Sequence, residues 1–202
     1  MRRYSPALNS LESYILFTLA NSGMPALVKL KPSSLITFYK KQINEITNFF
    51  ALLEVELNKF QCLYKVLYES STAYFVLIYA PSLLENVLTE NRNHSLLINN
   101  GYNANDVTLE KKLEQLTLRY HKSNLKAIDF PHEIGIFLGY PLYDVEEFIA
   151  NKGENYILNG YWKVYHNVEE ARNIFRNYNE VREKAVYSFF AGINKSMPSN
   201  MW

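Results

Sequence analysis

Apolar side chains recur at steps of three and four residues along most of the chain, a spacing that places them on one face of an α-helix. The clearest stripe runs from Leu35 to Leu57, and another runs from Ala171 to Phe189. Capping residues support several helix ends, among them Ser5 before Pro6, Gly23, Asn167 and Gly192. The pattern predicts helices over residues 6–21, 33–58, 81–88, 95–99, 108–122, 131–138, 142–151 and 167–192.

Three segments rich in β-branched and aromatic residues interrupt the helical pattern. Residues 61–69 and 73–79 flank a polar break of hairpin length, which predicts an antiparallel hairpin. The second of these strands is apolar throughout, so we expect both of its faces to be covered. Residues 156–166 are interpreted as a third strand, bulged at Gly160. The fold class predicted is helix-dominated α+β, with a small, mainly antiparallel three-stranded sheet.

The linkers between these elements are short, which favours a single domain over residues 1–202 with a loose tail from about residue 194. A chain of 202 residues with 48% hydrophobic side chains can build a core without a disulfide or a structural metal. The net charge of +1 makes nucleic-acid binding an unfavourable hypothesis.

Cysteine content and hydropathy bear on the compartment. Cys62 is the one cysteine, which excludes an intrachain disulfide and suggests a reducing environment. The apolar run at residues 14–20 is too short to cross a bilayer. We therefore expect a cytoplasmic protein without membrane contact.

The segment Phe130–Val145 is the most informative stretch, since it gathers two prolines, two glycines, a histidine and several aromatic residues. It predicts two short helices joined by a tight corner at Gly139-Tyr140-Pro141. Gly135 lies inside the first helix, where glycine costs about 1 kcal/mol relative to alanine. Close helix packing or a ligand near the backbone would compensate, and packing is the favoured explanation. A helix–corner–helix could also bind DNA. The second helix, however, carries acids such as Asp144 and no arginine, so it would repel DNA phosphates.

His132 and Glu133 stand at the start of the first of these helices and are candidate catalytic residues. The pair could act in general acid–base chemistry or hold a metal ion. The favoured alternative is structural, with the pair capping the helix. No second histidine follows at helical spacing, so the sequence predicts no metal site and identifies no cofactor.

Alternation along residues 161–165 suggests a binding surface on the third predicted strand. Trp162 and Val164 share one face, and Tyr161, Lys163 and Tyr165 share the other. If the first face is buried, the second presents a lysine between two tyrosines, which could bind an anionic or planar ligand. An ordinary exposed strand surface is the favoured alternative.

A second candidate anion site lies at Lys29, Lys31 and the following serine pair Ser33-Ser34. If these serines start a helix, its free backbone N–H groups could bind a phosphate or carboxylate together with the lysines. Helix capping alone is the favoured alternative, and the absence of a glycine-rich loop argues against a nucleotide site.

Several motifs resemble those of a bacterial family of unknown function, found mostly in anaerobic Gram-positive species. The most specific is FPHEIGIFLGYP at residues 130–141, followed by DVEEFI, NKG and GYWKVY. The segment MPALVKLKPSSL at residues 24–35, the pattern IY-x-x-x-L at 78–83 and EARNIFRNY at 170–178 are also similar to that family. The resemblance covers almost the whole chain.

The resemblance implies no assigned activity. It implies a link to iron or redox physiology, because genes of the family often lie near flavodoxin-like and iron-uptake genes. Members often carry one cysteine before the first proline and another in the last helix. Gly23 and Val181 occupy those places here, which puts a thiol or metal role in doubt for this chain.

Three function hypotheses follow. The leading one is a binding protein for a small anionic or cofactor-like ligand, or for a redox protein partner, with the site near residues 130–145 and the 161–165 strand. Its candidate binding residues are Tyr140, Trp162, Lys163, Tyr165 and Lys31. The second is an enzyme that uses His132 and Glu133 with Tyr140 or Lys163. The third is an adaptor that binds proteins through an exposed aromatic surface.

Overall fold

The structure is a computed structural model, and it describes residues 10–105 and 108–196. The N-terminal half contains α1 (Leu11–Thr18), the π-helical turn η1 (Leu19–Gly23), α2 (Met24–Leu27), β1 (Ser33–Tyr39), the 3₁₀ turn η2 (Lys40–Gln42), α3 (Ile46–Asn58), β2 (Leu63–Glu69) and β3 (Ala73–Tyr79). The C-terminal half contains α4 (Pro81–Thr89), α5 (Asn91–Asn99), α6 (Leu109–Asn124), α7 (Ile134–Phe137), α8 (Leu142–Ala150), β4 (Leu158–Asn159), β5 (Lys163–Val164) and α9 (Val168–Ser196).

The predicted fold class is confirmed, since helices surround a small antiparallel sheet of order β1-β3-β2. The hairpin β2–β3 lies where the sequence predicts it. The prediction of the third strand is wrong, because the strand that completes the sheet is β1. It pairs with β3 from Ser33 opposite Tyr79 to Tyr39 opposite Ala73. The prediction of one helix over residues 33–58 is therefore wrong in its first half, and only α3 is helical there. Residues 36–39 are β-branched or aromatic, and pairing with β3 overrides the approximate helical spacing of this segment.

The predicted strand 156–166 does not join this sheet. It folds back on itself as the separate hairpin β4–β5, in which Leu158 lies opposite Val164 and Asn159 opposite Lys163. Gly160 lies in the turn of that hairpin. A methyl group on Gly160 would come within 2.1 Å of the Phe175 ring of α9, so glycine allows the turn to pack tightly against the helix.

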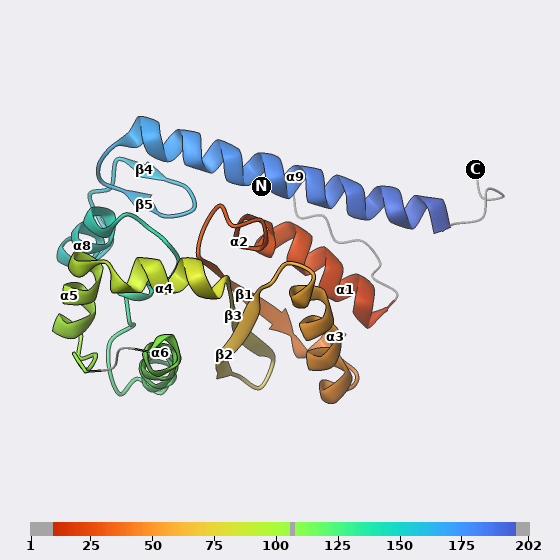
Figure 1. Cartoon of the computed structure of the whole chain (residues 1–202), viewed down its shortest axis with the longest axis horizontal. Helices are drawn as coiled ribbons and strands as arrows, with labels where there is room; N and C mark the ends of the chain where they lie inside the picture. The colour runs from red at the N-terminus through yellow and green to blue at the C-terminus, as the bar shows by residue number, and fades with distance from the viewer. Residues whose placement is uncertain (1–9, 106–107, 197–202) are drawn as a thin grey trace.

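Helices cover both faces of the three-stranded sheet, as Figure 1 shows for α3 and α6 on opposite sides. Tyr74, Val76 and Ile78 of β3 pack with α1 and α3 in one hydrophobic cluster. Leu77 and Tyr79 belong to a second cluster with residues of α4, α6 and α7. The central strand is thus covered on both faces, as its continuous apolar sequence predicts.

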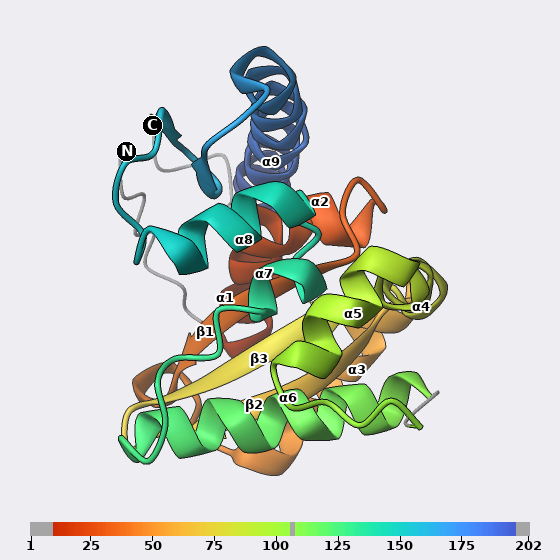
Figure 2. The ribbon, with the colours of Figure 1, turned by 90° about the vertical axis from the view of Figure 1, so that its left-hand side faces the viewer.

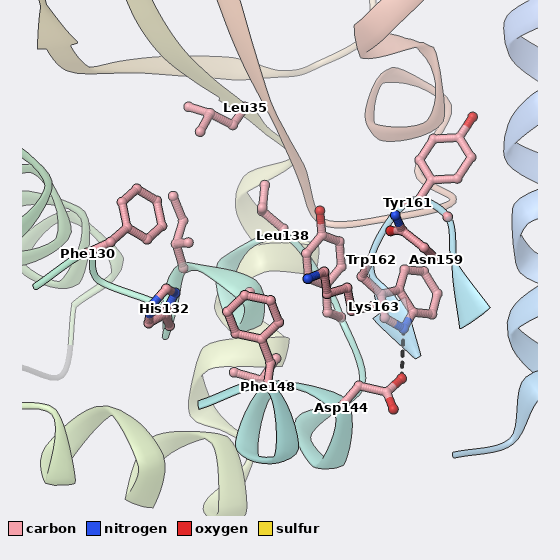
Figure 3. A pocket seen from close by; sticks show the side chains of 15 residues that line it. Leu35, Phe130, His132, Leu138, Asp144, Phe148, Asn159, Tyr161, Trp162 and Lys163 are labelled. Atoms are coloured by element: carbon pink, nitrogen blue, oxygen red, sulfur yellow. Dashed lines mark hydrogen bonds between the residues drawn. The ribbon is translucent and has the colours of Figure 1, made fainter. Parts of the chain in front are cut away.

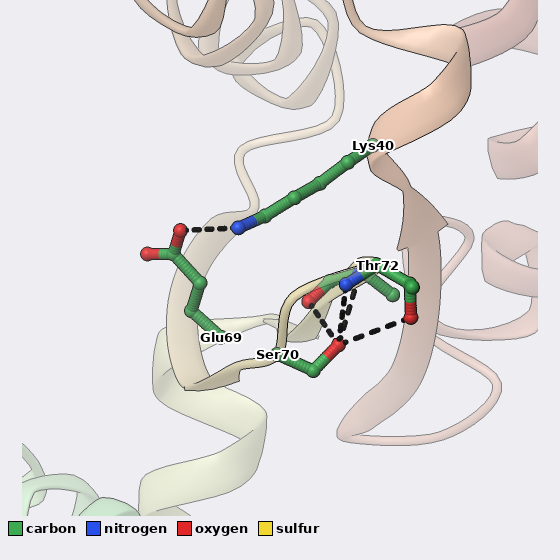
Figure 4. Close-up of polar contacts among 5 residues, drawn as sticks. Lys40, Glu69, Ser70 and Thr72 are labelled. Carbon is green, nitrogen blue, oxygen red and sulfur yellow. Dashed lines mark hydrogen bonds and ion pairs between the residues drawn. The ribbon is translucent and has the colours of Figure 1, made fainter.

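The polar break between β2 and β3 forms a tight turn (Figure 4). The Ser70 hydroxyl accepts hydrogen bonds from the backbone N–H groups of Thr72 and Ala73 at 3.2 and 2.9 Å. Lys40, directly after β1, forms an ion pair with Glu69 at the end of β2. These contacts join the ends of all three strands and fix the register of the hairpin.

The long helix α9 runs along the side of the molecule, above α1 and α2 in Figure 1. Trp162, Val164, Ala171 and Tyr178 form a third hydrophobic cluster that joins the β4–β5 hairpin to this helix. The helix begins after Asn167 as predicted but continues through Gly192, so the predicted end is wrong. The expected loose tail from residue 194 is helical to Ser196, and the rest lies outside the described residues.

The first predicted helix is also revised. The proposed cap at Ser5 and Pro6 lies outside the described residues, and Ser10 caps α1 by accepting from the N–H of Ser13. Gly23 does not end the helix, because its φ of −103° lies outside the left-handed region and the chain continues into α2. A methyl group there would lie 3.1 Å from Ile36 of β1, so Gly23 serves close packing on the sheet.

Candidate functional site

The corner at residues 139–141 is docked on the segment that precedes β1. Gly139 has φ of +74°, and a methyl group there would lie 2.3 Å from Pro32 Cδ. The hydroxyl of the buried Ser33 donates a hydrogen bond to the carbonyl of Phe137 at 2.7 Å. The two motifs 24–35 and 130–141, distant in sequence, therefore meet, and glycine is required where their backbones approach.

Packing also explains Gly135. A methyl group at this position would lie 2.7 Å from Val145 Cγ2 of α8, so the glycine lets α7 and α8 approach closely. The favoured interpretation of this residue is confirmed. The same glycine forms part of the wall of a cavity.

A cavity of about 320 Å³ lies between the α7–α8 corner and the β4–β5 hairpin (Figure 3). Its walls are mostly apolar and aromatic, and the polar groups lie at a few positions. It is lined by Leu35, Phe130, His132, Ile134, Gly135, Leu138, Tyr140, Asp144, Val145, Phe148, Asn159, Gly160, Tyr161, Trp162 and Lys163. The structure thus brings four sequence-predicted candidates together around one cavity: His132, Tyr140, Trp162 and Lys163.

His132 is half-buried in this wall, between two aromatic rings. Its imidazole lies 5.3 Å from the ring centre of Phe130 and 5.0 Å from that of Phe148. The histidine is therefore an aromatic element of the cavity wall, and one face of the cavity carries three adjacent rings.

Glu133 does not join His132 in the cavity. Its carboxylate is 1% exposed and accepts a hydrogen bond from Arg119 Nε of α6 at 2.6 Å. The buried Tyr102 hydroxyl donates to the same oxygen at 3.4 Å, and burial raises the pKa of this phenol. His132 and Glu133 are adjacent in sequence but lie in different environments, and the predicted acid–base pair is not assembled.

Asp144 connects α8 to the hairpin through three hydrogen bonds. One carboxylate oxygen accepts from the Trp162 indole Nε1–H at 2.7 Å. The other accepts from the backbone N–H groups of Tyr165 at 2.8 Å and His166 at 3.2 Å. Because both oxygens of this buried carboxylate accept hydrogen bonds, Asp144 positions the Trp162 wall.

Tyr140 and Trp162 form the opposite wall. Their rings stack with centres 5.3 Å apart and planes inclined by 28°. Burial raises the pKa of the Tyr140 phenol to about 12, so it stays protonated at neutral pH. A flat ligand would lie between this pair and the rings on the His132 side.

Lys163 is a cation at the cavity wall. Its ammonium donates a hydrogen bond to the carbonyl of Gly153 and lies 4.6 Å from the Tyr156 ring centre and 5.7 Å from that of Phe148. A lysine carries three donors, so this arrangement fixes the ammonium and leaves donors for a ligand.

Tyr165 departs from the expected exposed strand face. Its side chain is 6% exposed, and its hydroxyl is buried without a hydrogen-bond partner among the described residues. The predicted surface with a lysine between two tyrosines is wrong at this residue, because the chain bends out of the strand after Val164 to start α9. Tyr156, not Tyr165, supplies the ring beside Lys163.

Lys31 lines a neighbouring hollow and is not part of the main cavity. The anion site expected at a helix start near Lys29 and Lys31 is not formed, because Ser33 and Ser34 begin the strand β1. Lys29 lies outside the hollow and donates to the carbonyl of Phe60 at 2.6 Å.

Sequence reasoning missed the cavity residues Phe130, Phe148 and Asn159. It also missed two hydrogen-bond partners, Arg119 for Glu133 and Asp144 for Trp162. The helical spacing of Asp144 and Phe148, four residues apart, places both on one face of α8 and could have linked them. No local signal pairs Asp144 with Trp162 or Glu133 with Arg119.

No cluster of three or more histidine, cysteine, aspartate or glutamate side chains that could hold a metal ion occurs within residues 10–105 and 108–196. In the same part of the chain, no helix combines the length and the apolar character needed to cross a bilayer.

Comparisons with known proteins identify the family. Neither the curated proteins nor the solved structures contain a significant match. A family profile described as "Protein of unknown function (DUF3793)" matches residues 19–197, which include every residue that lines the cavity. Because this match spans most of the sequence, the chain belongs to that family.

Proposed function

We propose that this protein binds a small planar ligand that carries a negative charge, in the cavity between the α7–α8 corner and the β4–β5 hairpin. The observation that carries the proposal is the composition of the wall: aromatic rings on two sides, the cation Lys163, and the acid Asp144, whose two oxygens are hydrogen-bonded to the hairpin. Flat rings contact a planar ligand over its whole face, and the ammonium supplies its counter-charge.

The size of the cavity limits the class of ligand. A volume of about 320 Å³ lies at the lower end of the range, roughly 300–1,000 Å³, that small-molecule sites occupy. The cavity is suited to one ring system with a short acidic group and is too small for a dinucleotide. This ligand class agrees with the anionic or cofactor-like molecule expected from the sequence.

The setting of this function remains a prediction. A single buried cysteine is consistent with a cytoplasmic protein, where thiols stay reduced. The link to iron or redox physiology rests on the family resemblance. Neither affects the test of the binding site itself.

Probe binding tests the proposal. We expect anilinonaphthalene sulfonate, an aromatic anion built on a flat naphthalene ring, to bind at one site and quench Trp162 in a Trp202→Phe background, where Trp162 is the one tryptophan. Lys163→Met should weaken this binding about tenfold, the loss expected for one hydrogen bond to a charged group (~1.5 kcal/mol). Fluorescence titration measures both.

Two controls distinguish binding at this site from nonspecific binding of the probe. Lys184→Met removes an exposed lysine of α9 outside the cavity and should leave the affinity unchanged. Phenyl naphthylamine has the same rings without the sulfonate, and its binding should not respond to Lys163→Met. Equal weakening of both probes, or no effect of Lys163→Met on the anion, would contradict the proposal.

A further inference from the structure

A second hollow of about 310 Å³ adjoins the main cavity and has its own polar group. It is lined by Ser22, Pro25, Lys31, Ser34, Leu35, Leu138, Tyr140 and Tyr161. Four of these residues, Leu35, Leu138, Tyr140 and Tyr161, also line the main cavity, so the two spaces share a wall. Lys31 belongs to the second hollow alone.

Lys31 is an unusual lysine because it is buried without an acid. Its side chain is 7% exposed, and among the described residues no carboxylate lies within ion-pair distance of its ammonium. The ammonium instead lies 5.3 Å from the ring centre of Tyr140 and 5.8 Å from that of Tyr178. Two rings compensate only part of the cost of taking an ammonium out of water.

The groups around Lys31 favour an anion. The element packed on each side contributes a tyrosine: Tyr140 before α8, Tyr178 of α9 and Tyr161 of the β4–β5 turn. Burial raises the pKa of each of these phenols, so none supplies a negative charge at neutral pH. Ser34, also buried, adds a hydroxyl donor to the wall.

We infer that the Lys31 hollow is a second binding site, which takes a carboxylate or phosphate group as the counter-ion of the buried ammonium. The site is separate from the cavity that holds the planar ligand, and it depends on a different lysine. Failure of the naphthalene probe to bind would therefore leave this inference intact.

The charge of Lys31 gives the site a defined pH dependence. Burial lowers the pKa of the Lys31 ammonium from its ordinary 10.5 to about 8. The ammonium is therefore mostly charged at pH 7 and loses its proton as the pH rises through 8. Anion affinity should be greatest below pH 8 and fall about tenfold for each further pH unit, since only the protonated form attracts the anion.

Magnetic resonance of isotope-labelled lysine side chains tests this site directly. The Lys31 signal is identified as the one missing from Lys31→Met, and its titration midpoint is measured in chloride, acetate and phosphate at equal ionic strength. We expect a midpoint near 8 in chloride. Acetate, phosphate or both should raise it, because a bound anion stabilises the ammonium. The signal of Lys184 should not respond.

The two anions separate the possible sources of the charge. A response to acetate alone assigns the site to carboxylates, and a response to phosphate alone assigns it to phosphate groups. A midpoint that neither anion moves, or a chloride midpoint at the ordinary value, would overturn the inference.

Stability provides a second readout. Because the buried ammonium is costly, Lys31→Met should unfold at the same or a higher denaturant concentration than the original chain at pH 7. Any gain should disappear as the pH rises through 8 to above 10.5, where both the folded and the unfolded chain carry a neutral amine. Unfolding of Lys31→Met at a clearly lower concentration would show that the amine serves the fold, and would also contradict the site.

Discussion

Replacing Asp144 by alanine should lower the free energy of unfolding by about 3–5 kcal/mol, because the change leaves three donors without an acceptor. These are the indole N–H of Trp162 and the backbone N–H groups of Tyr165 and His166. Asp144 is 4% exposed, so water cannot readily take its place. Denaturant unfolding, followed by far-ultraviolet circular dichroism, measures the loss.

Two further variants identify the cause. Asp144→Asn keeps one oxygen for the two backbone donors but turns an amide donor toward the indole, so it should lose less than alanine and still be destabilised. Glu146→Ala removes an exposed acid from the same helix and should change stability by less than about 0.5 kcal/mol. If Asp144→Ala were as mild as Glu146→Ala, Asp144 would not hold α8 to the hairpin.

Arg119→Met should also cost about 3–5 kcal/mol, since it leaves the buried carboxylate of Glu133 without its partner. The pair is short, at 2.6 Å, and the carboxylate side is almost fully enclosed. The double variant with Glu133→Gln should recover much of the loss, because no buried charge then remains. A double-mutant cycle from urea unfolding measures this coupling.

A more open ion pair on the same protein serves as the control. Lys59 and Glu56 also meet at 2.6 Å, and Glu56 is largely buried, but the lysine is more than half exposed, so water reaches the pair. Lys59→Met should therefore cost less than Arg119→Met. The same experiment bears on the catalytic hypothesis for Glu133. Replacing a catalytic acid lowers activity with little loss of stability, whereas breaking a structural ion pair lowers stability.

The strongly periodic parts of the fold could be predicted from the sequence. Helices α6 and α8, the β2–β3 hairpin and the glycine corner at residue 139 follow from local spacing and capping. The strand β1 could not, because Leu35, Tyr39 and Ile43 also fit a helical stripe. Only its pairing with β3, some forty residues further on, decides between the two.

The candidate site could be predicted in part, for the same reason. The density of aromatic residues and glycines around Tyr140 and Trp162 indicated where a site would form, and both residues line the cavity. The direction of neighbouring side chains could not be predicted. His132 lines the cavity whereas Glu133 pairs with Arg119 of α6, and both placements depend on packing between elements distant in sequence.

The arrangement of the site around the α7–α8 corner is visible in Figure 2, where both helices lie between the sheet and α9. The cavity is lined by elements of the C-terminal half of the chain and by Leu35 of β1. Ligand binding should stabilise their packing together, because the ligand would contact the α7–α8 corner, the hairpin and Leu35 of β1 at once.

Native mass spectrometry of the protein purified from the cells that naturally produce it tests the central claim most directly. The account predicts one bound small acid with an aromatic ring system per chain, absorbing in the near ultraviolet and released when the chain unfolds, with occupancy reduced in Lys163→Met. Recovery of the bare chain alone under these conditions, or a bound species that is aliphatic or cationic, would contradict it.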